Sequence, residues 1–171
     1  MYVITVDELI KLLRLEPLPH EGGFFVETYR SKDLVPKSAL PPGYSGERSV
    51  CTAIYYLLTP ETFSAIHRLQ GDEIFHFYLG DPVEMLQLGP EGKAEIATLG
   101  PDLARGMKLQ YVVAGGAWQG SRLLEGGRYA LLGTTVAPGF DYQDFELGAR
   151  SALQDQYPQF SSLIGRLTRA S

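Results

Sequence analysis

Short runs in which hydrophobic and polar residues alternate fill the middle of the chain, and a period of two is that of a half-buried β-strand. Turn-forming clusters such as Gly80-Asp81-Pro82 separate the runs. The gaps are too short for the helical crossovers that parallel strands require, so the pattern predicts an all-β fold, an antiparallel sandwich or barrel. Nine runs are predicted to be strands: Gly23–Arg30, Ser49–Leu58, Thr62–Leu69, Glu73–Leu79, Val83–Leu88, Ala94–Thr98, Leu109–Ala114, Ala117–Leu124 and Arg128–Val136.

A helical period occurs only near the two ends of the chain. Hydrophobic residues recur every three or four positions along Val6–Leu13, directly after Thr5 as a potential N-cap, which predicts a short helix over about residues 5–14. The same spacing after Pro158 predicts a short helix over about residues 158–168. We therefore expect one helix at each end of the β region.

Composition supports a single globular domain. Hydrophobic residues make up 44% of the chain and charged residues 20%, which excludes a disordered chain and a coiled coil. No linker or internal repeat is visible, so residues 1–171 are expected to form one domain with its core over about 15–150. The stretch Lys32–Glu47, rich in Pro, Gly and Ser, is expected to be the longest loop, a flap over one end of the barrel.

Charge and cysteine content limit the partners. The net charge is −5 and no run of Lys or Arg occurs, so nothing favours a nucleic acid partner. No apolar stretch approaches the roughly 20 residues that span a bilayer, and Met1–Ile10 lacks the basic start of a signal peptide, so no membrane partner is expected. Cys51 is the only cysteine, which excludes an intrachain disulfide and favours a cytoplasmic location.

Candidate chemistry is sparse. The three histidines and one cysteine are too few for a finger-type zinc site, and no nucleophile elbow or phosphate-binding glycine loop is present. Cys51 lies in an apolar run without a nearby base and is expected to be a buried, inert thiol. His20 lies in a turn before the first strand, where a structural role is expected.

The stretch Ala65–Gly80 carries the clearest signal. Along the strand Glu73–Leu79, side chains alternate, so Glu73, Phe75 and Phe77 share one face while His76 lies on the other. A carboxylate among aromatic residues on an inward face costs desolvation energy unless it is paired, binds a ligand or acts as a base. A hairpin would bring His67 beside it, although an exposed strand end with both groups solvated is the alternative. His76 is then expected at the outer surface or at a dimer interface.

Two short patterns carry a resemblance to a known superfamily. The spacing His67-x-Leu69-x3-Glu73-x6-Gly80 resembles the first motif of the cupin superfamily, His-x-His-x3–4-Glu-x6-Gly, and the segment 114–119, which ends at Gln119, resembles a degraded second motif. Longer strings resemble the uncharacterised cupin-5 branch, and together they span about residues 15–150. These strings are Leu18–Ser31, Arg48–Leu58, Asp72–Met85 and Val136–Gly148.

The resemblance implies an RmlC-like β-jelly-roll barrel, usually dimeric, with a pocket inside it. Metal-binding cupins use three histidines and one glutamate, but Leu69 and Gln119 stand here where two of the histidines belong. Affinity for a divalent metal should therefore be weak, and any metal would be held by His67, Glu73 and Gln119. The favoured expectation is a metal-free pocket without a cofactor, in which these residues bind a ligand through hydrogen bonds.

Three functions follow from this pocket. The first is binding of a small polar molecule by His67, Glu73 and Gln119, with Phe75 and Phe77 on the inner wall. The second, implied by similarity to metal-free sugar epimerases of the superfamily, is an epimerase or isomerase with His67 as general base, oriented by Glu73, and an unassigned tyrosine as acid. A nucleotide-sugar substrate would require convergent arginines, for which the candidates are Arg30, Arg48, Arg68 and Arg122. The third is a weakly metal-dependent cupin enzyme such as a dioxygenase.

Two expectations concern the periphery of the barrel. Asp141, Asp144 and Glu146 are expected to form a solvated loop that caps or clamps the barrel. A small open barrel leaves sheet edges and an outer apolar face, so a homodimer is expected because pairing covers both.

Overall fold

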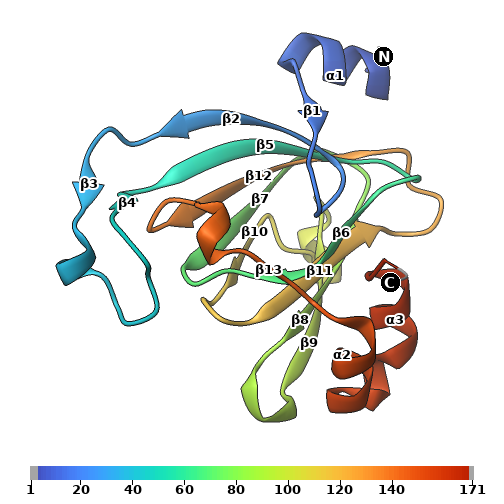
Figure 1. Ribbon diagram of the computed structural model, residues 1–171. Coiled ribbons are helices and arrows are strands. Elements are labelled where there is room, and N and C mark those ends of the chain that lie inside the picture. Colours follow the sequence, from blue (N-terminus) through green and yellow to red (C-terminus); the bar gives the residue numbers. More distant parts are fainter. Residues whose placement is uncertain (1–3, 170–171) are drawn as a thin grey trace.

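The computed structural model describes residues 4–169 and shows two antiparallel sheets facing each other (Figure 1). This is the all-β jelly-roll fold that the pattern and the resemblance predict. One sheet has the strand order β1-β2-β5-β12-β7-β10, and the other has the order β13-β6-β11-β8-β9. The strands of the first sheet are β1 (Glu16–Pro17), β2 (Phe24–Arg30), β5 (Thr52–Leu58), β12 (Ala130–Ala137), β7 (Asp72–Gly80) and β10 (Gln110–Val113). Those of the second are β13 (Glu146–Leu147), β6 (Phe63–Arg68), β11 (Trp118–Leu123), β8 (Val83–Leu88) and β9 (Ala94–Leu99).

Each of the nine predicted runs contains a strand, because alternation identifies strands that have one buried face. The run Ser49–Leu58 is interrupted at Val50 and Cys51, so that it forms β4 (Arg48–Ser49) and β5. The sequence pattern does not show β1, β13 or β3 (Leu34–Val35), because two residues are too few to establish a period.

A helix is present at each end of the β region, as predicted. Helix α1 (Val6–Leu13) begins after Thr5, whose side chain and that of Glu8 form a reciprocal capping box. At the other end, a 3₁₀ turn and α3 (Ser161–Arg166) occupy the predicted helical stretch, and α2 (Arg150–Gln156) is an additional helix before them. Helix α2 buries only Leu153, so it has no apolar stripe for the sequence pattern to reveal. No helix within residues 4–169 has the length and apolar character needed to cross a membrane.

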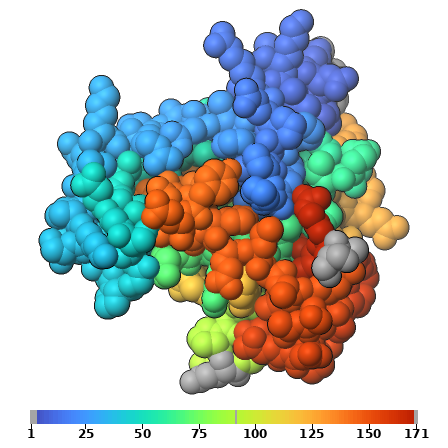
Figure 2. Space-filling view, in the orientation of Figure 1, coloured from blue at the N-terminus to red at the C-terminus, as the bar shows by residue number. Residues whose placement is uncertain are grey.

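Three apolar clusters hold the fold together. The main cluster lies between the two sheets and includes Phe75, Phe77 and Leu132. A second joins α2 and α3 to the five-stranded sheet, and a third joins α1 to the outer face of the six-stranded sheet. Figure 2 shows the C-terminal helices on one side of the barrel and the orange segment near residues 140–148 beside the blue N-terminal segment. The main cluster leaves one end of the barrel unfilled.

The stretch Lys32–Glu47 does not cover that open end, contrary to the expectation of a flap. It contains β3, which pairs with β4, and a single 3₁₀ turn. None of its residues lines the cavity described below. Ser45 instead donates a hydrogen bond to Gln143, so the stretch packs on the loop that follows β12.

Candidate functional site

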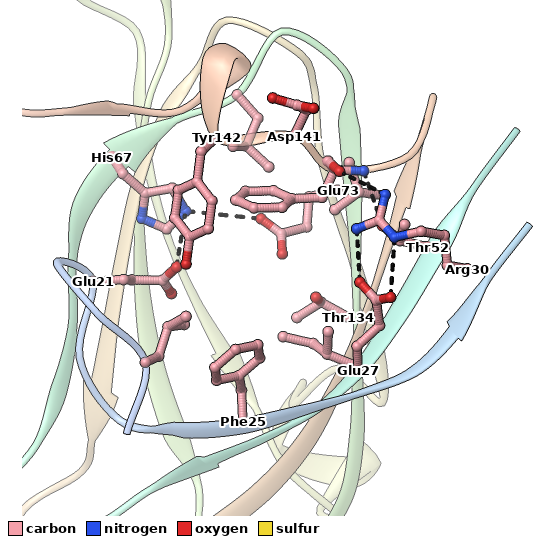
Figure 3. Close-up of a pocket in the computed structure, with 15 residues that line it drawn as sticks. Glu21, Phe25, Glu27, Arg30, Thr52, His67, Glu73, Thr134, Asp141 and Tyr142 are labelled. Carbon is pink, nitrogen blue, oxygen red and sulfur yellow. Dashed lines mark hydrogen bonds and ion pairs between the residues drawn. The ribbon is translucent and has the colours of Figure 1, made fainter. Parts of the chain in front are cut away.

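A cavity of about 520 Å³ occupies the open end of the barrel (Figure 3). Its wall comes from strands β2, β5, β6, β7 and β12, from the turn before β2 and from the loop after β12. The apolar lining residues are Leu18, Phe25, Ile54, Leu69, Val136 and Phe140, and the polar or ionisable ones are Glu21, Glu27, Arg30, Thr52, His67, Glu73, Thr134, Asp141 and Tyr142.

His67 is held rigidly in the wall by β6. Its side chain is 2% exposed, and its ring stacks on Phe145 with centroids 5.1 Å apart. The Nδ1 atom lies 2.8 Å from the carbonyl oxygen of Ala65. A carbonyl oxygen can only accept, so Nδ1 must carry a proton. Whatever the protonation state of the ring, only Nε2 is available for chemistry in the cavity.

That Nε2 atom faces two carboxylates. It lies 3.9 Å from Oε2 of Glu21 and 3.9 Å from Oε2 of Glu73 (Figure 3). Both distances exceed an ordinary hydrogen bond but are short enough for strong electrostatic attraction in a buried site. A neutral ring with its proton on Nδ1 would direct a lone pair at two negative groups, so the imidazolium form is favoured.

The electrostatics of the site give His67 a high pKa. Burial alone lowers it, but Glu21, Glu73 and the carbonyl of Ala65 outweigh this effect and raise the pKa to about 9. The pKa of the Glu21 carboxyl is raised too, chiefly by burial, with His67 opposing the shift and Glu73 adding to it. The protonation of His67 and that of Glu21 therefore depend on each other.

The structure brings together His67, Glu73 and Gln119, although Gln119 does not reach the cavity. Gln119 on β11 is the direct antiparallel partner of His67 on β6. Its Nε2 donates a 2.6 Å hydrogen bond to Oε2 of Glu73, so it holds that carboxylate from behind. Its Oε1 atom is buried and has no hydrogen-bond partner among residues 4–169. Gln119 is thus placed to position Glu73 rather than to touch a ligand.

Phe75 and Phe77 share the inward face of β7 with Glu73, as alternation predicts. They do not line the cavity, however, and the expectation that they form its wall is corrected. Both are buried in the main cluster, where Phe75 is 1% exposed, because successive inward residues step away from the open end of the barrel. The aromatic wall comes instead from Phe25, Phe140 and Tyr142.

Glu21 is the functional group that sequence reasoning missed. It projects into the cavity from the turn His20–Gly23, in which His20, Gly22 and Gly23 all have positive φ (66°, 109° and 72°). A Cβ on Gly22 would lie 2.5 Å from the carbonyl oxygen of Phe63, so only glycine fits there. Ser64 Oγ donates a 2.7 Å hydrogen bond to Glu21. In the sequence, the two glycines that directly follow Glu21 were the signal that could have indicated this turn.

Of the four candidate arginines, only Arg30 reaches the cavity. Arg48, Arg68 and Arg122 form ion pairs elsewhere, with Asp144, Glu146 and Glu84 respectively. Convergent arginine clamps for a nucleotide diphosphate are therefore absent from the lining that the structure describes.

The remaining candidates lie outside the centre of the site. His76 is on the outer sheet face, in hydrogen-bonding contact with Gln110 and Thr135, and His20 is a structural turn residue. In the acidic loop, Asp144 clamps the barrel through its buried ion pair with Arg48. Asp141 differs from the expectation of a solvated residue because it lines the cavity.

The donor set does not fit a tightly held transition metal. It offers one histidine nitrogen, Nε2 of His67, and a metal there would have to displace the proton that the two facing carboxylates favour. Leu69 lines the cavity where a second nitrogen ligand would be required, and Gln119 directs its amide at Glu73. Within residues 4–169, no group of three or more His, Cys, Asp or Glu side chains is arranged to hold a metal ion.

Comparisons with known proteins identify the family of this chain. The family model described as "Cupin superfamily (DUF985)" matches residues 7–148. The uncharacterised protein YML079W of Saccharomyces cerevisiae is 32% identical over 132 residues, which cover 72% of this chain and 66% of the yeast protein. This chain thus spans just under two thirds of the yeast protein.

Two solved structures are similar over nearly the whole chain. Protein SO0799 from Shewanella oneidensis is 36% identical with a TM-score of 0.85, and the match covers 99% of this chain and 100% of that one. A hypothetical protein from Leishmania major is 33% identical with a TM-score of 0.86, covering 98% and 100%. Since the family model covers most of the sequence and the fold is the expected jelly roll, the chain belongs to the cupin superfamily, in its DUF985 (cupin-5) family.

Proposed function

We propose that this cupin binds a small polar molecule in the open end of its barrel, and that His67 donates a hydrogen bond to an oxygen of that ligand. The observation that carries the proposal is the placement of Nε2 of His67, buried, facing the cavity and 3.9 Å from each of two carboxylates. A ligand hydroxyl next to the ring could accept from Nε2 and donate to Glu21 or Glu73.

The shape of the cavity supports the same proposal. Its volume of about 520 Å³ is within the range that small-molecule sites occupy. Phe25, Phe140 and Tyr142 provide apolar surface near the opening, while Glu21, His67 and Glu73 provide the polar groups. An apolar wall with a few convergent polar groups is the arrangement that orients a ligand.

A second candidate function is proton transfer on such a ligand, as in an isomerase or epimerase. A histidine whose pKa is about 9 is protonated at neutral pH, so it would act as an acid rather than as the general base expected from the sequence. His67 would donate to a carbonyl oxygen of the ligand, and Glu21 or Glu73 would accept a proton from the neighbouring carbon. The observation that favours this candidate is the presence of a proton donor and two carboxylates on one cavity wall.

A ligand screen tests the binding function. Uncharged hydroxy and carbonyl compounds would be added to ¹⁵N-labelled protein, and amide shifts of cavity residues followed by NMR. We expect a compound that binds the wild-type protein. His67→Gln should bind the same compound at least about tenfold more weakly, because a charge-assisted hydrogen bond is lost. His76→Gln, which alters a histidine on the outer face, should bind as the wild type does. The proposal fails if no compound perturbs the cavity or if His67→Gln binds equally well.

We also propose that two copies of this chain associate through the outer face of the six-stranded sheet. Away from α1, the outward side chains of β2, β5, β10 and β12 carry no Lys, Arg, Asp or Glu, and those of β7 carry only Asp72, at the start of the strand. Tyr29, Tyr78 and Val112 are 54%, 50% and 52% exposed there. Large exposed apolar residues on a face with few charges are typical of an interface.

A further inference from the structure

We infer that the ligand of this cavity carries no phosphate or other anionic group, and that Glu27 enforces this exclusion by occupying Arg30. The inference rests on the proposed binding function and narrows it to one ligand class, uncharged molecules rich in hydrogen-bond donors. It identifies Glu27 as a specificity-determining residue at the mouth of the cavity.

Arg30 is the only Arg or Lys among the residues that line the cavity. A guanidinium at a cavity mouth would ordinarily bind a phosphate or carboxylate through two parallel hydrogen bonds. Here Glu27, three residues earlier on the same strand, takes both positions: Nε donates to Oε1 at 3.0 Å and Nη2 donates to Oε2 at 2.7 Å. Nη1 donates to the carbonyl oxygen of Phe140 at 3.1 Å. Each nitrogen of the guanidinium thus makes one hydrogen bond within the protein, and the Nε–Nη2 edge that would bind an anion through two parallel bonds is taken by Glu27.

A local irregularity of β2 creates this pairing. The register of β2 against β5 shifts between Glu27 and Tyr29, so a bulge separates Glu27 from Arg30. In a regular strand, residues three apart point to opposite faces. The extra residue returns both side chains to the cavity side, where they meet (Figure 3). The ion pair is therefore built into the backbone of this strand.

The rest of the lining also disfavours an anion. Four carboxylates line the cavity, those of Glu21, Glu27, Glu73 and Asp141, against the positive charges of Arg30 and His67. Carboxylates accept hydrogen bonds but do not donate them when ionised. A phosphate is also an acceptor, so these carboxylates would repel it, and His67 is the one cationic donor of the lining that Glu27 does not occupy. A ligand rich in hydroxyl groups would instead supply the donors that these carboxylates require.

Releasing Arg30 provides the test, with inorganic phosphate as the probe. Phosphate would be titrated into the wild-type protein and into Glu27→Gln, against chloride at equal ionic strength, while the Nε–H signal of Arg30 is followed by NMR. We expect phosphate to bind Glu27→Gln at Arg30 with an apparent affinity about tenfold or more above that of the wild type, since a bidentate charge-assisted contact becomes available. Adding Arg30→Gln to Glu27→Gln should abolish the gain, which is followed in this double variant by the amide shifts of cavity residues.

The matched control is Glu146→Gln, which releases Arg68 from a similarly exposed ion pair outside the cavity. It should leave the response of Arg30 to phosphate unchanged. The inference is overturned if the wild type binds phosphate at Arg30 as well as Glu27→Gln does, or if Glu27→Gln gains nothing. Glu27 and Arg30 are 39% and 43% exposed, so the substitution should leave the fold intact. This titration uses no organic ligand, so a failed ligand screen would count against the proposed function alone.

Discussion

The Nδ1 atom of His67 donates a hydrogen bond to the carbonyl oxygen of Ala65, two residues earlier on the same strand, at 2.8 Å. This contact determines the tautomer of the ring, and it leaves Nε2 as the atom that faces the cavity. The backbone of β6 thereby sets the chemistry of the site, because a second proton on the ring is stabilised by the two carboxylates opposite Nε2. The predictions on His67 follow from this relationship.

The stability of the protein should fall as pH rises from about 6.5 to about 9. His67 releases its proton near pH 6.5 when unfolded but near 9 when folded, so the folded state binds more protons between these values and loses stability as pH increases. The slope contributed by one such group is at most about 1.4 kcal/mol per pH unit. Urea unfolding at several pH values measures it. Glu73→Gln should flatten the slope and His76→Gln should not, whereas a wild-type stability that is constant over this window would contradict the prediction.

Asp144→Asn should destabilise the protein strongly. The Arg48–Asp144 ion pair is 4% and 7% exposed, and removing one partner leaves a buried, uncompensated charge, which costs about 3–5 kcal/mol. Glu146→Gln breaks an exposed pair with Arg68 and should cost less than about 1 kcal/mol. The free energy of unfolding is measured with denaturant for both variants. If both lose the same amount, Asp144 does not clamp the barrel.

Gly22→Ala should displace Glu21 and lower the pKa of His67. The added Cβ would lie 2.5 Å from the carbonyl oxygen of Phe63, so the turn must move in addition to accepting a left-handed alanine. Gly126→Ala is the control, because Gly126 also has positive φ (83°) but has open space around its Cβ position. Both variants should lose about 1 kcal/mol or more to backbone strain, but only Gly22→Ala should change the titration of His67. If the pKa of His67 in Gly22→Ala equals that in the wild-type protein, Glu21 does not contribute to the high pKa of His67.

Light scattering should give the mass of a dimer for the wild-type protein. Tyr78→Lys or Val112→Lys places a charge among the exposed apolar side chains on the outer face of the six-stranded sheet and should shift the protein toward monomer. Leu103→Lys, at a residue 61% exposed in a 3₁₀ turn, serves as the control and should remain dimeric. A monomeric wild type, or dimers that persist in both outer-face variants, would count against this interface.

The strand β7 was predictable because its inward side chains are buried and its outward ones are not, so that its alternation can be seen in the sequence. The proximity of His67, Glu73 and Gln119 was accessible through the same alternation and the cupin-like spacing. Glu21 was not, because a turn with positive φ at His20, Gly22 and Gly23 has no periodicity, and its direction depends on contacts with β6. The depth of Phe75 and Phe77 was also hidden, since alternation gives the face of a residue but not its position along the barrel axis.

The charge state of His67 could not be predicted from the sequence either. The sequence indicates that His67 and Glu73 interact, but the sign of the pKa shift depends on whether burial or attraction dominates. The second carboxylate, Glu21, decides the balance, and it comes from a segment of no apparent periodicity. The sequence-based prediction of His67 as a base suits an ordinary histidine, whereas two carboxylates that raise its pKa to about 9 favour the role of an acid.

The most direct test of the account is the ¹⁵N chemical shift of the two ring nitrogens of His67 as a function of pH. We predict that both nitrogens are protonated at pH 7, that Nε2 loses its proton near pH 9, and that Glu21→Gln and Glu73→Gln each lower this pKa. A ring that is singly protonated at pH 7 in the wild-type protein, with a bare Nε2 facing Glu21 and Glu73, would contradict it.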